Sequence, residues 1–317
     1  MVGQAPGKGP LFGYYPNGVK TWLIVKPALE DAAQATFAGT DVQITVQGKR
    51  HLGAALGTRS FAEQYVTERV TTWTKELSKL ATIARTHPQA AYCAFVHAIR
   101  SKWLYLARIV PDLQDLLQPL EDAIRQIFIP ALTGRVSPGD LERELLSLPA
   151  RLGGLGLVNP VMMADNEHQA SLHLTSTLVC LLAQQGSATT TIQLPRQLTK
   201  NDLKCMKRQR EKQCAANLWE RLPTTLQRAT DVASEKGASA WLAALPLADH
   251  AFDLQKGAFV TPCVCVMAGS FITCPRSAFV EKSLIKSMHL VARQMVYRLC
   301  DTTKSGTFSH PRCPKCA

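Results

Sequence analysis

The hydrophobic pattern of this chain changes near residue 60 from the period of a strand to the period of a helix. Before that point, residues 19–26 are rich in β-branched and aromatic side chains, and apolar side chains alternate over 42–46. After it, apolar residues recur every three or four positions until His87 and Pro88 end the pattern. They are Val66, Val70, Trp73, Leu77, Leu80 and Ala84. The pattern predicts a mainly α protein with a small β part at its N-terminus, which is an α+β fold.

Start and stop signals divide the region after residue 60 into several helices. Ser60 and Glu63 have the spacing of a capping box, so we expect the first helix to begin at Ser60. Pro88 suits the first turn of a second helix, which the apolar pattern carries to about Ile109. Similar signals predict helices within 111–129, from Ser137 onward, and over 161–185. The stretch 186–195, GSATTTIQLP, is rich in small polar residues and predicts a linker between modules.

The second predicted helix has two different faces when its residues are projected onto a helical wheel. One face is apolar and is formed by Tyr92, Phe95, Val96, Ile99, Trp103 and Leu106. The opposite face carries His97, Arg100 and Arg108. Two interpretations remain open, because this face is either the ordinary solvated side of a surface helix or a basic face that meets nucleic acid.

The positive charge is concentrated in the last part of the chain. The net charge is +12, and residues 191–317 carry 19 of the 36 basic side chains but only 9 of the 24 acidic ones. Six basic residues fall within thirteen positions: Lys200, Lys204, Lys207, Arg208, Arg210 and Lys212. Such a cluster attracts phosphate backbones by releasing their condensed counterions. It predicts RNA or DNA as a partner, and the alternative is a solvated basic surface without a specific partner.

Neither a secretion signal nor a membrane span is evident in the sequence. The start MVGQAPGKGP has no apolar core, and the longest apolar stretch, 172–183, is well short of the ~20 residues that cross a bilayer. We therefore expect an intracellular protein, nuclear or cytoplasmic, with no membrane partner. In such a compartment the ten cysteines are expected to be thiols or metal ligands rather than disulfides.

Several common catalytic motifs are missing from the sequence. The stretch GQAPGKG (3–9) has the wrong glycine spacing for a phosphate-binding loop, and GGLG (153–156) lacks the third glycine of a dinucleotide fingerprint. Neither HExxH nor GxSxG occurs. The acidic pairs Glu30–Asp31 and Glu121–Asp122 are expected to be surface charge on helices.

Four sequence blocks, taken in order, carry a family resemblance. They are GYYPNGVKTWLIVK (13–26), GTDVQITVQGKRHLGAALG (39–57), QPLEDAIRQIFIPALTG (118–134) and LPARLGGLGLVNP (148–160). Together they resemble the C-terminal half of the reverse transcriptase of non-LTR retrotransposons, over about residues 9–185. The stretch 241–259 resembles the segment that comes next in those elements. The resemblance implies a palm remnant over 1–59, a helical thumb over 60–185, a linker and basic helical segment over 186–260, and a degenerate Cys-rich region over 261–317.

The resemblance also implies roles for individual residues. Lys20 matches a lysine near the incoming nucleotide, which makes it a candidate proton donor to the departing pyrophosphate. A hairpin that grips the primer end is matched by Lys49, Arg50, His51, Leu52 and Gly53. The thumb and basic segment would bind an RNA–DNA duplex backbone through His97, Arg100, Arg108, Lys200, Lys204, Lys207, Arg208, Arg210 and Lys212.

The catalytic metal site of that family has no match in this sequence. The family holds two Mg²⁺ ions with paired aspartates, and no Asp–Asp pair occurs anywhere in the chain. We therefore expect no complete catalytic set, no cofactor of its own in this chain, and binding of nucleic acid without synthesis. Two alternatives stay open: a fragment of an active RNA-directed DNA polymerase whose upstream part is not included, and a helical protein-interaction module.

The last cysteines suggest a degenerate zinc site. Cys263, Cys265 and Cys274 resemble a cysteine-and-histidine knuckle of related elements, but Ser270 stands where those elements have histidine. A tetrahedral Zn²⁺ site needs four ligands, and this cluster offers three. The candidates to complete it are Cys300, His289, or the terminal His310, Cys313 and Cys316, and the two half-sites are further apart than a usual zinc ribbon allows.

Overall fold

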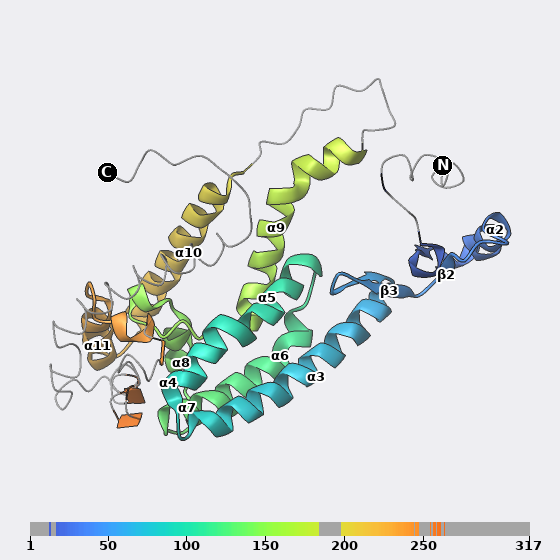
Figure 1. Ribbon diagram of the computed structural model, residues 1–317. Coiled ribbons are helices and arrows are strands. Elements are labelled where there is room, and N and C mark those ends of the chain that lie inside the picture. The colour runs from blue at the N-terminus through green and yellow to red at the C-terminus, as the bar shows by residue number, and fades with distance from the viewer. Residues whose placement is uncertain are drawn as a thin grey trace, which may run out of the picture. The chain divides into compact units, whose positions relative to one another are not determined.

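The computed structural model describes Gly13, residues 17–183 and 198–243, and a few positions beyond: 245–246, 254, 256–257, 259–260 and 263. The described chain is mostly helical with small sheets near its N-terminus, which confirms the predicted mainly α class (Figure 1). It divides into two compact units. The first comprises residues 1–85, 91–138 and 158–211, and the second comprises 86–90, 139–157 and 212–317.

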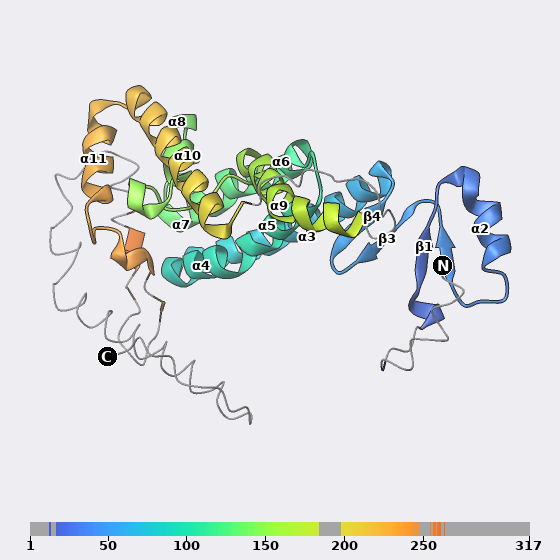
Figure 2. The same cartoon turned by 90° about the horizontal axis from the view of Figure 1, so that it is seen from above.

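The first unit begins with a short parallel strand pair. Strands β1 (Trp22–Ile24) and β2 (Gln43–Thr45) pair in register from Trp22 opposite Gln43 to Ile24 opposite Thr45, and helix α2 (Glu30–Thr36) connects them (Figure 2). β1 starts later than the sequence predicts, because residues 18–20 form a 3₁₀ turn. Asn17 Oδ1 caps that turn by accepting from the Lys20 amide at 3.2 Å.

A β-hairpin comes next, as the family resemblance predicts. Strands β3 (Gly48–His51) and β4 (Ala54–Gly57) are antiparallel, and Gly48 lies opposite Gly57. Both glycines have positive φ, at 155° and 142°. A Cβ on Gly57 would collide with the carbonyl oxygen of Gln47 and the Cα of Gly48. Position 57 therefore requires glycine.

The long helix α3 (Arg59–Ala84) begins one position earlier than Ser60. Its N-cap is Thr58, whose Oγ1 accepts from the Phe61 amide at 3.3 Å, so the predicted capping box is wrong. Ser60 is already in the first helical turn, and Glu63 pairs with Arg59 instead, at 2.6 Å. The predicted apolar face is confirmed, because its residues are buried: Val66, Val70, Trp73, Leu77, Leu80 and Ala84.

The second predicted helix is confirmed from Pro88 to Ile109, with a π-helical turn in its middle. It consists of α4 (Pro88–Ala94), the π turn Phe95–Ile99, and α5 (Arg100–Ile109). A second π turn, Ile124–Phe128, joins α6 (Gln114–Ala123) to α7 (Ile129–Thr133). The two turns bring Phe95 and Phe128 into a stacked pair with ring centroids 4.8 Å apart. The turns therefore serve the core of the first unit.

Four helices build that core. α3 packs against α6, and both α5 and α6 pack against α9 (Pro160–Ala183) (Figure 1). Trp103 on α5 is fully buried between Phe95 and Trp73, with ring centroids 5.8 and 6.3 Å away. Glu121 on α6 is 5% exposed, so its prediction as surface charge is wrong. It lies on the inner face of α6, one position after the buried Leu120.

The second unit has its own apolar core. It contains α8 (Asp140–Ser147), the 3₁₀ turns 150–152 and 240–243, the C-terminal half of α10 (Lys200–Arg221), and α11 (Thr224–Ser234). The core consists of Leu145, Leu148, Leu218, Leu222, Leu226 and Ala233. Gly154 comes after the 150–152 turn, and a Cβ there would collide with the carbonyl oxygens of Leu145 and Leu148.

The predicted linker at 186–195 lies outside the described residues. The basic segment after it is confirmed as helical, since Lys200 to Lys212 all lie in α10. Among the helices of the described residues, none combines the length and the apolar character needed to cross a bilayer.

Candidate nucleic-acid interface

The hairpin tip is an exposed turn in a strained conformation. Leu52 and Gly53 form the turn between β3 and β4, and both have positive φ, at 48° and 85°. This conformation suits glycine but costs a leucine roughly 1–2 kcal/mol. The Leu52 side chain is 82% exposed, so burial does not offset that cost.

Two tyrosines, one on α3 and one on α5, form hydrogen bonds to the hairpin tip. The Tyr65 hydroxyl on α3 donates to the Gly53 carbonyl oxygen at 2.9 Å, and the Tyr105 hydroxyl on α5 donates to the Leu52 carbonyl oxygen at 2.6 Å. A Cβ on Gly53 would lie 3.3 Å from the Tyr105 ring, so the ring also covers the turn closely. The hairpin is therefore fixed to the helical core at its tip.

The basic residues of the hairpin have different surroundings. Lys49 lies with its Nζ 3.6 Å from the centroid of the Trp22 ring on β1, which is a cation–π contact. Arg50 and His51 are exposed and form no ion pair with other described residues. Lys20 is also exposed, at the end of the 3₁₀ turn before β1.

The predicted basic face of the second helix is present in part. His97 and Arg108 are exposed, whereas Arg100 is half-buried. Loss of hydration on burial lowers the pKa of Arg100, although the nearby Tyr92 and Glu167 oppose that shift. Arg100 comes directly after the π turn, and the extra residue of that turn rotates the rest of the helix relative to a regular helical wheel.

Glu167 on α9 binds two of the predicted basic residues at once. Arg108 Nε on α5 lies 2.9 Å from its Oε2, and Lys207 Nζ on α10 lies 3.2 Å from its Oε1. The Glu167 side chain is 13% exposed, against 54% for Arg108 and 62% for Lys207. Burial alone would raise the pKa of Glu167, but the charges and hydrogen bonds of Lys207 and Arg108 outweigh it and hold the pKa below its usual value.

The remaining predicted residues of α10 are exposed cations without a carboxylate partner in the described part of the chain. They are Lys200, Lys204, Arg208, Arg210 and Lys212. Some other surface cations pair with carboxylates, Arg59 with Glu63 and Asp112, Lys102 with Glu76, and Arg221 with Glu144, whereas Lys75 and Lys79 on α3 are also exposed and have no such partner among the described residues. α10 therefore carries five exposed cations without a carboxylate partner among the described residues, beside Lys207 and Arg221, which have one.

The candidate zinc ligands are only partly described. Cys263 is buried, and Cys265, Cys274, Cys313 and Cys316 lie outside the described residues. Among the residues that are described, no group of three or more His, Cys, Asp or Glu side chains has a geometry that could hold a metal ion. The zinc site stays a prediction.

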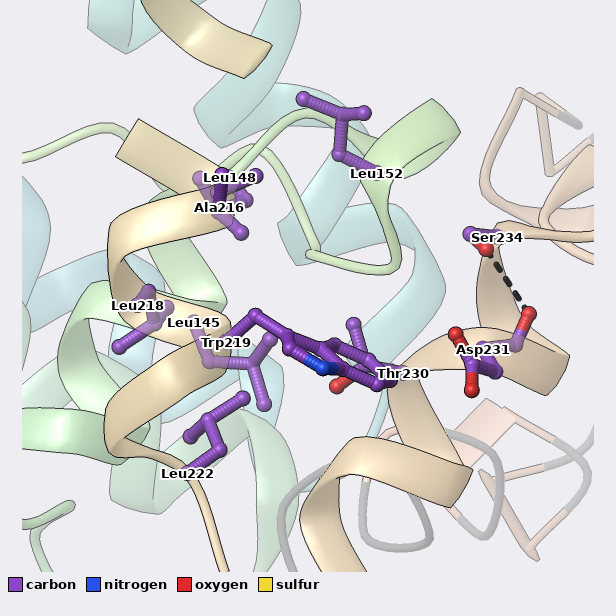
Figure 3. Close-up of a pocket in the computed structure, with 11 residues that line it drawn as sticks. Leu145, Leu148, Leu152, Ala216, Leu218, Trp219, Leu222, Thr230, Asp231 and Ser234 are labelled. Atoms are coloured by element: carbon purple, nitrogen blue, oxygen red, sulfur yellow. Dashed lines mark hydrogen bonds between the residues drawn. The ribbon is translucent and has the colours of Figure 1, made fainter. Parts of the chain in front are cut away.

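A cavity of about 240 Å³ lies in the second unit, and none of the predicted site residues lines it (Figure 3). Trp219 reaches across it toward Thr230, and five of the eleven lining residues are leucines. At one end the Ser234 hydroxyl donates to the Asp231 carbonyl oxygen at 2.8 Å. The cavity is an extension of the apolar core with a small polar rim.

The sequence alone does not single out the residues that organise the candidate interface. Tyr65 fits the apolar face of α3, and Tyr105 has no pattern of its own in the sequence. Glu167 is one of two acids in α9, beside Asp165, and its partners are 59 and 40 positions away. Only the tertiary structure brings these groups to the hairpin and to the cations.

Comparison of the chain with protein-family models, with curated proteins and with solved structures finds no match in any of the three. The function is therefore inferred from the geometry of the described residues.

Proposed function

We propose that this chain binds nucleic acid through its backbone phosphates, and that it does so without catalysing synthesis. The observation that carries the proposal is the row of unpaired, exposed cations on α10. Two like charges repel by about 1 kcal/mol at 4 Å even in bulk water, so an uncompensated cluster weakens the free helix. A polyanion that approaches this helix relieves the repulsion and releases its own counterions.

The positions of these cations fit an extended anion better than a compact one. Lys200, Lys204 and Arg208 occupy positions i, i+4 and i+8, which places successive members about one turn apart along one side of a helix. Successive members are about 6 Å apart along the helix axis. A phosphate backbone offers charges repeatedly over such a length, whereas a single carboxylate of a peptide offers one.

The hairpin tip is a second contact in the proposed function. Arg50 and His51 offer unpaired donors beside the exposed Leu52 side chain. The tyrosine hydroxyl groups fix the tip before any ligand arrives, so binding there would cost little additional ordering. The resemblance to reverse transcriptases implies that this tip meets the end of a primer strand.

We propose that the chain does not catalyse synthesis because its sequence lacks the residues that this reaction needs. Phosphoryl transfer in the resembled family depends on paired aspartates, and the sequence contains no such pair. Lys20 alone could supply a proton, but it cannot replace carboxylates that stabilise the transferred phosphate.

A helical protein-interaction module is the second candidate function. It is favoured by exposed apolar residues along the C-terminal half of α9: Leu172, Leu178, Val179, Leu181 and Leu182. Large apolar side chains grouped on one exposed helix are typical of a surface that meets another protein.

A salt titration tests the proposed function. Fluorescence anisotropy with a labelled RNA–DNA hybrid should show tight binding at low salt, and log Kd should rise linearly with log salt. Lys204→Gln, Arg208→Gln and Arg210→Gln combined should weaken binding to any sequence about equally, because phosphates carry no base information. A matched variant, with Lys75, Lys79 and Arg85 of α3 and its C-cap changed to Gln, removes the same charge and should bind nearly as well as the parent.

Three outcomes would contradict the proposed function. The first is no binding by the parent chain at low salt. The second is an affinity that does not change with salt, which would favour the protein-interaction candidate. The third is an equal loss in both triple variants, which would indicate net charge alone and no role for α10.

A further inference from the structure

We infer that Arg108 and Lys207, held together by Glu167, form a subsite for one backbone phosphate. The inference rests on the proposed function and deepens it, because it assigns a particular contact to particular atoms. Both cations approach the same carboxylate, Arg108 Nε at 2.9 Å and Lys207 Nζ at 3.2 Å. Their charged ends are therefore neighbours although they come from different helices, α5 and α10.

Each cation keeps donors that Glu167 does not use. Within the described part of the chain, Arg108 bonds only through Nε, so its Nη1 and Nη2 groups remain available. Two such N–H groups in one plane match two oxygens of a phosphate. The Lys207 ammonium has three N–H groups and gives one to Glu167. Donors for more than one phosphate oxygen are thus present side by side.

The exposures of the three side chains set the order in which a ligand meets them. Arg108 and Lys207 are each more than half exposed, while Glu167 is nearly buried. An anion arriving from solvent contacts the cations first, and the carboxylate stays behind them. Glu167 is thus a positioning residue, which brings two long side chains together before the ligand binds.

The same carboxylate limits the strength of the subsite. Two cations and one carboxylate leave a net charge of one positive unit, and Glu167 repels the phosphate that the cations attract. Like charges about 6–7 Å apart repel by about 0.6–0.7 kcal/mol in water and by about four times as much at the effective dielectric constant of a protein surface. We expect the removal of that charge to outweigh any loss of order in the two cations.

The neighbouring charges favour a phosphate of a nucleic acid over a single carboxylate of a protein. Lys204 and Arg208 lie within one turn of Lys207 on α10 and are unpaired in the described part of the chain. His97 is exposed on the π turn that precedes α5, the helix that carries Arg108. A ligand seated on the subsite therefore meets further positive charge along α10, which suits a chain of phosphates.

A double-mutant cycle on the full chain tests the subsite. The probe is the same labelled RNA–DNA hybrid, and the variants are Arg108→Gln, Lys207→Gln, their combination, and Glu167→Gln. If both cations serve one phosphate, the double variant should lose little more affinity than either single one, and its salt slope should fall by about one. Two separate phosphates would give additive losses and a slope lower by about two, which would overturn the inference.

Charge removal at Glu167 gives an independent arm of the test. Glu167→Gln should bind the hybrid roughly three- to tenfold more tightly at low salt, and Lys207→Gln combined with Glu167→Gln should regain most of the affinity lost by Lys207→Gln alone. Glu144→Gln is the matched control, since it also frees an arginine, Arg221, from its carboxylate. Equal tightening in Glu144→Gln and Glu167→Gln, or none in Glu167→Gln, would overturn the subsite.

Two further results separate the possible failures. A parent chain that does not bind the hybrid removes the proposed function and the subsite together, whereas salt-dependent binding with additive losses removes the subsite alone. Circular dichroism and the thermal midpoint of each variant show whether it is folded. Should Arg108→Gln fail to fold, the Lys207 and Glu167 variants still decide the question. Lys207 is largely exposed, and the Glu167→Gln change retains a hydrogen-bond acceptor at that position.

Discussion

The hydroxyl group of Tyr105 donates to the carbonyl oxygen of Leu52 at 2.6 Å, and the two residues are 53 positions apart. The contact joins α5 to the tip of the β3–β4 hairpin. Tyr65 makes the equivalent contact to Gly53 from α3, at 2.9 Å. Because a short two-stranded hairpin is at best marginally stable by itself, these bonds are part of what keeps the tip in one conformation.

Leu52→Asn should stabilise the protein by about 0.5–1 kcal/mol, because asparagine tolerates the left-handed conformation and Asn–Gly is the preferred pair for this type of turn. The 82% exposed leucine side chain contributes little burial that could be lost. Urea unfolding measures the change. Leu56→Asn in β4 is the control, since Leu56 is also exposed but has no positive φ, and it should not stabilise. A less stable Leu52→Asn protein would contradict the strain argument.

Tyr105→Phe and Tyr65→Phe should each cost about 0.5–1.5 kcal/mol, the net value of one hydrogen bond. The rings stay in place, so the loss should concentrate at the hairpin. Hydrogen exchange of the amides of residues 50–54 should become faster in both variants, while amides of the buried face of α3 should exchange as before. Unchanged exchange at the tip would show that the two hydroxyl groups do not restrain it.

The sequence pattern predicted the core of the first unit well and the interface poorly. Val66 and Leu77 could be placed because burial follows the helical period, which is a local property. The helix start was misplaced by a short distance, since Thr58 and Ser60 have similar capping chemistry and only the backbone distinguishes them. The helical wheel placed Arg100 on the polar face opposite the apolar one, but Arg100 is half-buried, and the π turn before it is invisible to a regular wheel.

Ion pairs between residues far apart in the sequence explain why the charges of the candidate interface were predicted less well than the core. The basic residues were correctly expected on helices, but the sequence does not show which of them a carboxylate neutralises. Glu167 reaches Arg108 and Lys207 across 59 and 40 positions, and Arg221 reaches Glu144 across 77. Such pairs depend on how helices pack, and no local pattern encodes them.

Gly154→Ala should destabilise the second unit by roughly 2 kcal/mol or more, because the added Cβ would collide with two backbone carbonyl oxygens that cannot move away independently. Gly139→Ala is the matched control. A Cβ at Gly139 meets no atom within 4 Å, and its φ of −65° suits alanine. That change should alter stability by less than about 1 kcal/mol. Similar unfolding midpoints for the two variants would contradict the close packing at Gly154.

The Glu167 ion pairs should make stability depend on pH in the acidic range. The pKa of Glu167 is lower in the folded protein than in an unfolded chain, where a glutamate has a pKa near 4.3. Its contribution is therefore fully present above the unfolded pKa and is lost as the pH falls through the folded pKa. Urea unfolding at several pH values between about 6 and 3 should show this loss in the parent chain, and Glu167→Gln should show a smaller decline. Glu144 lies in an exposed pair, for which little stabilisation is expected, so Glu144→Gln should follow the parent curve closely. Parallel curves for Glu167→Gln and the parent would show that Arg108 and Lys207 do not stabilise the ionised carboxylate.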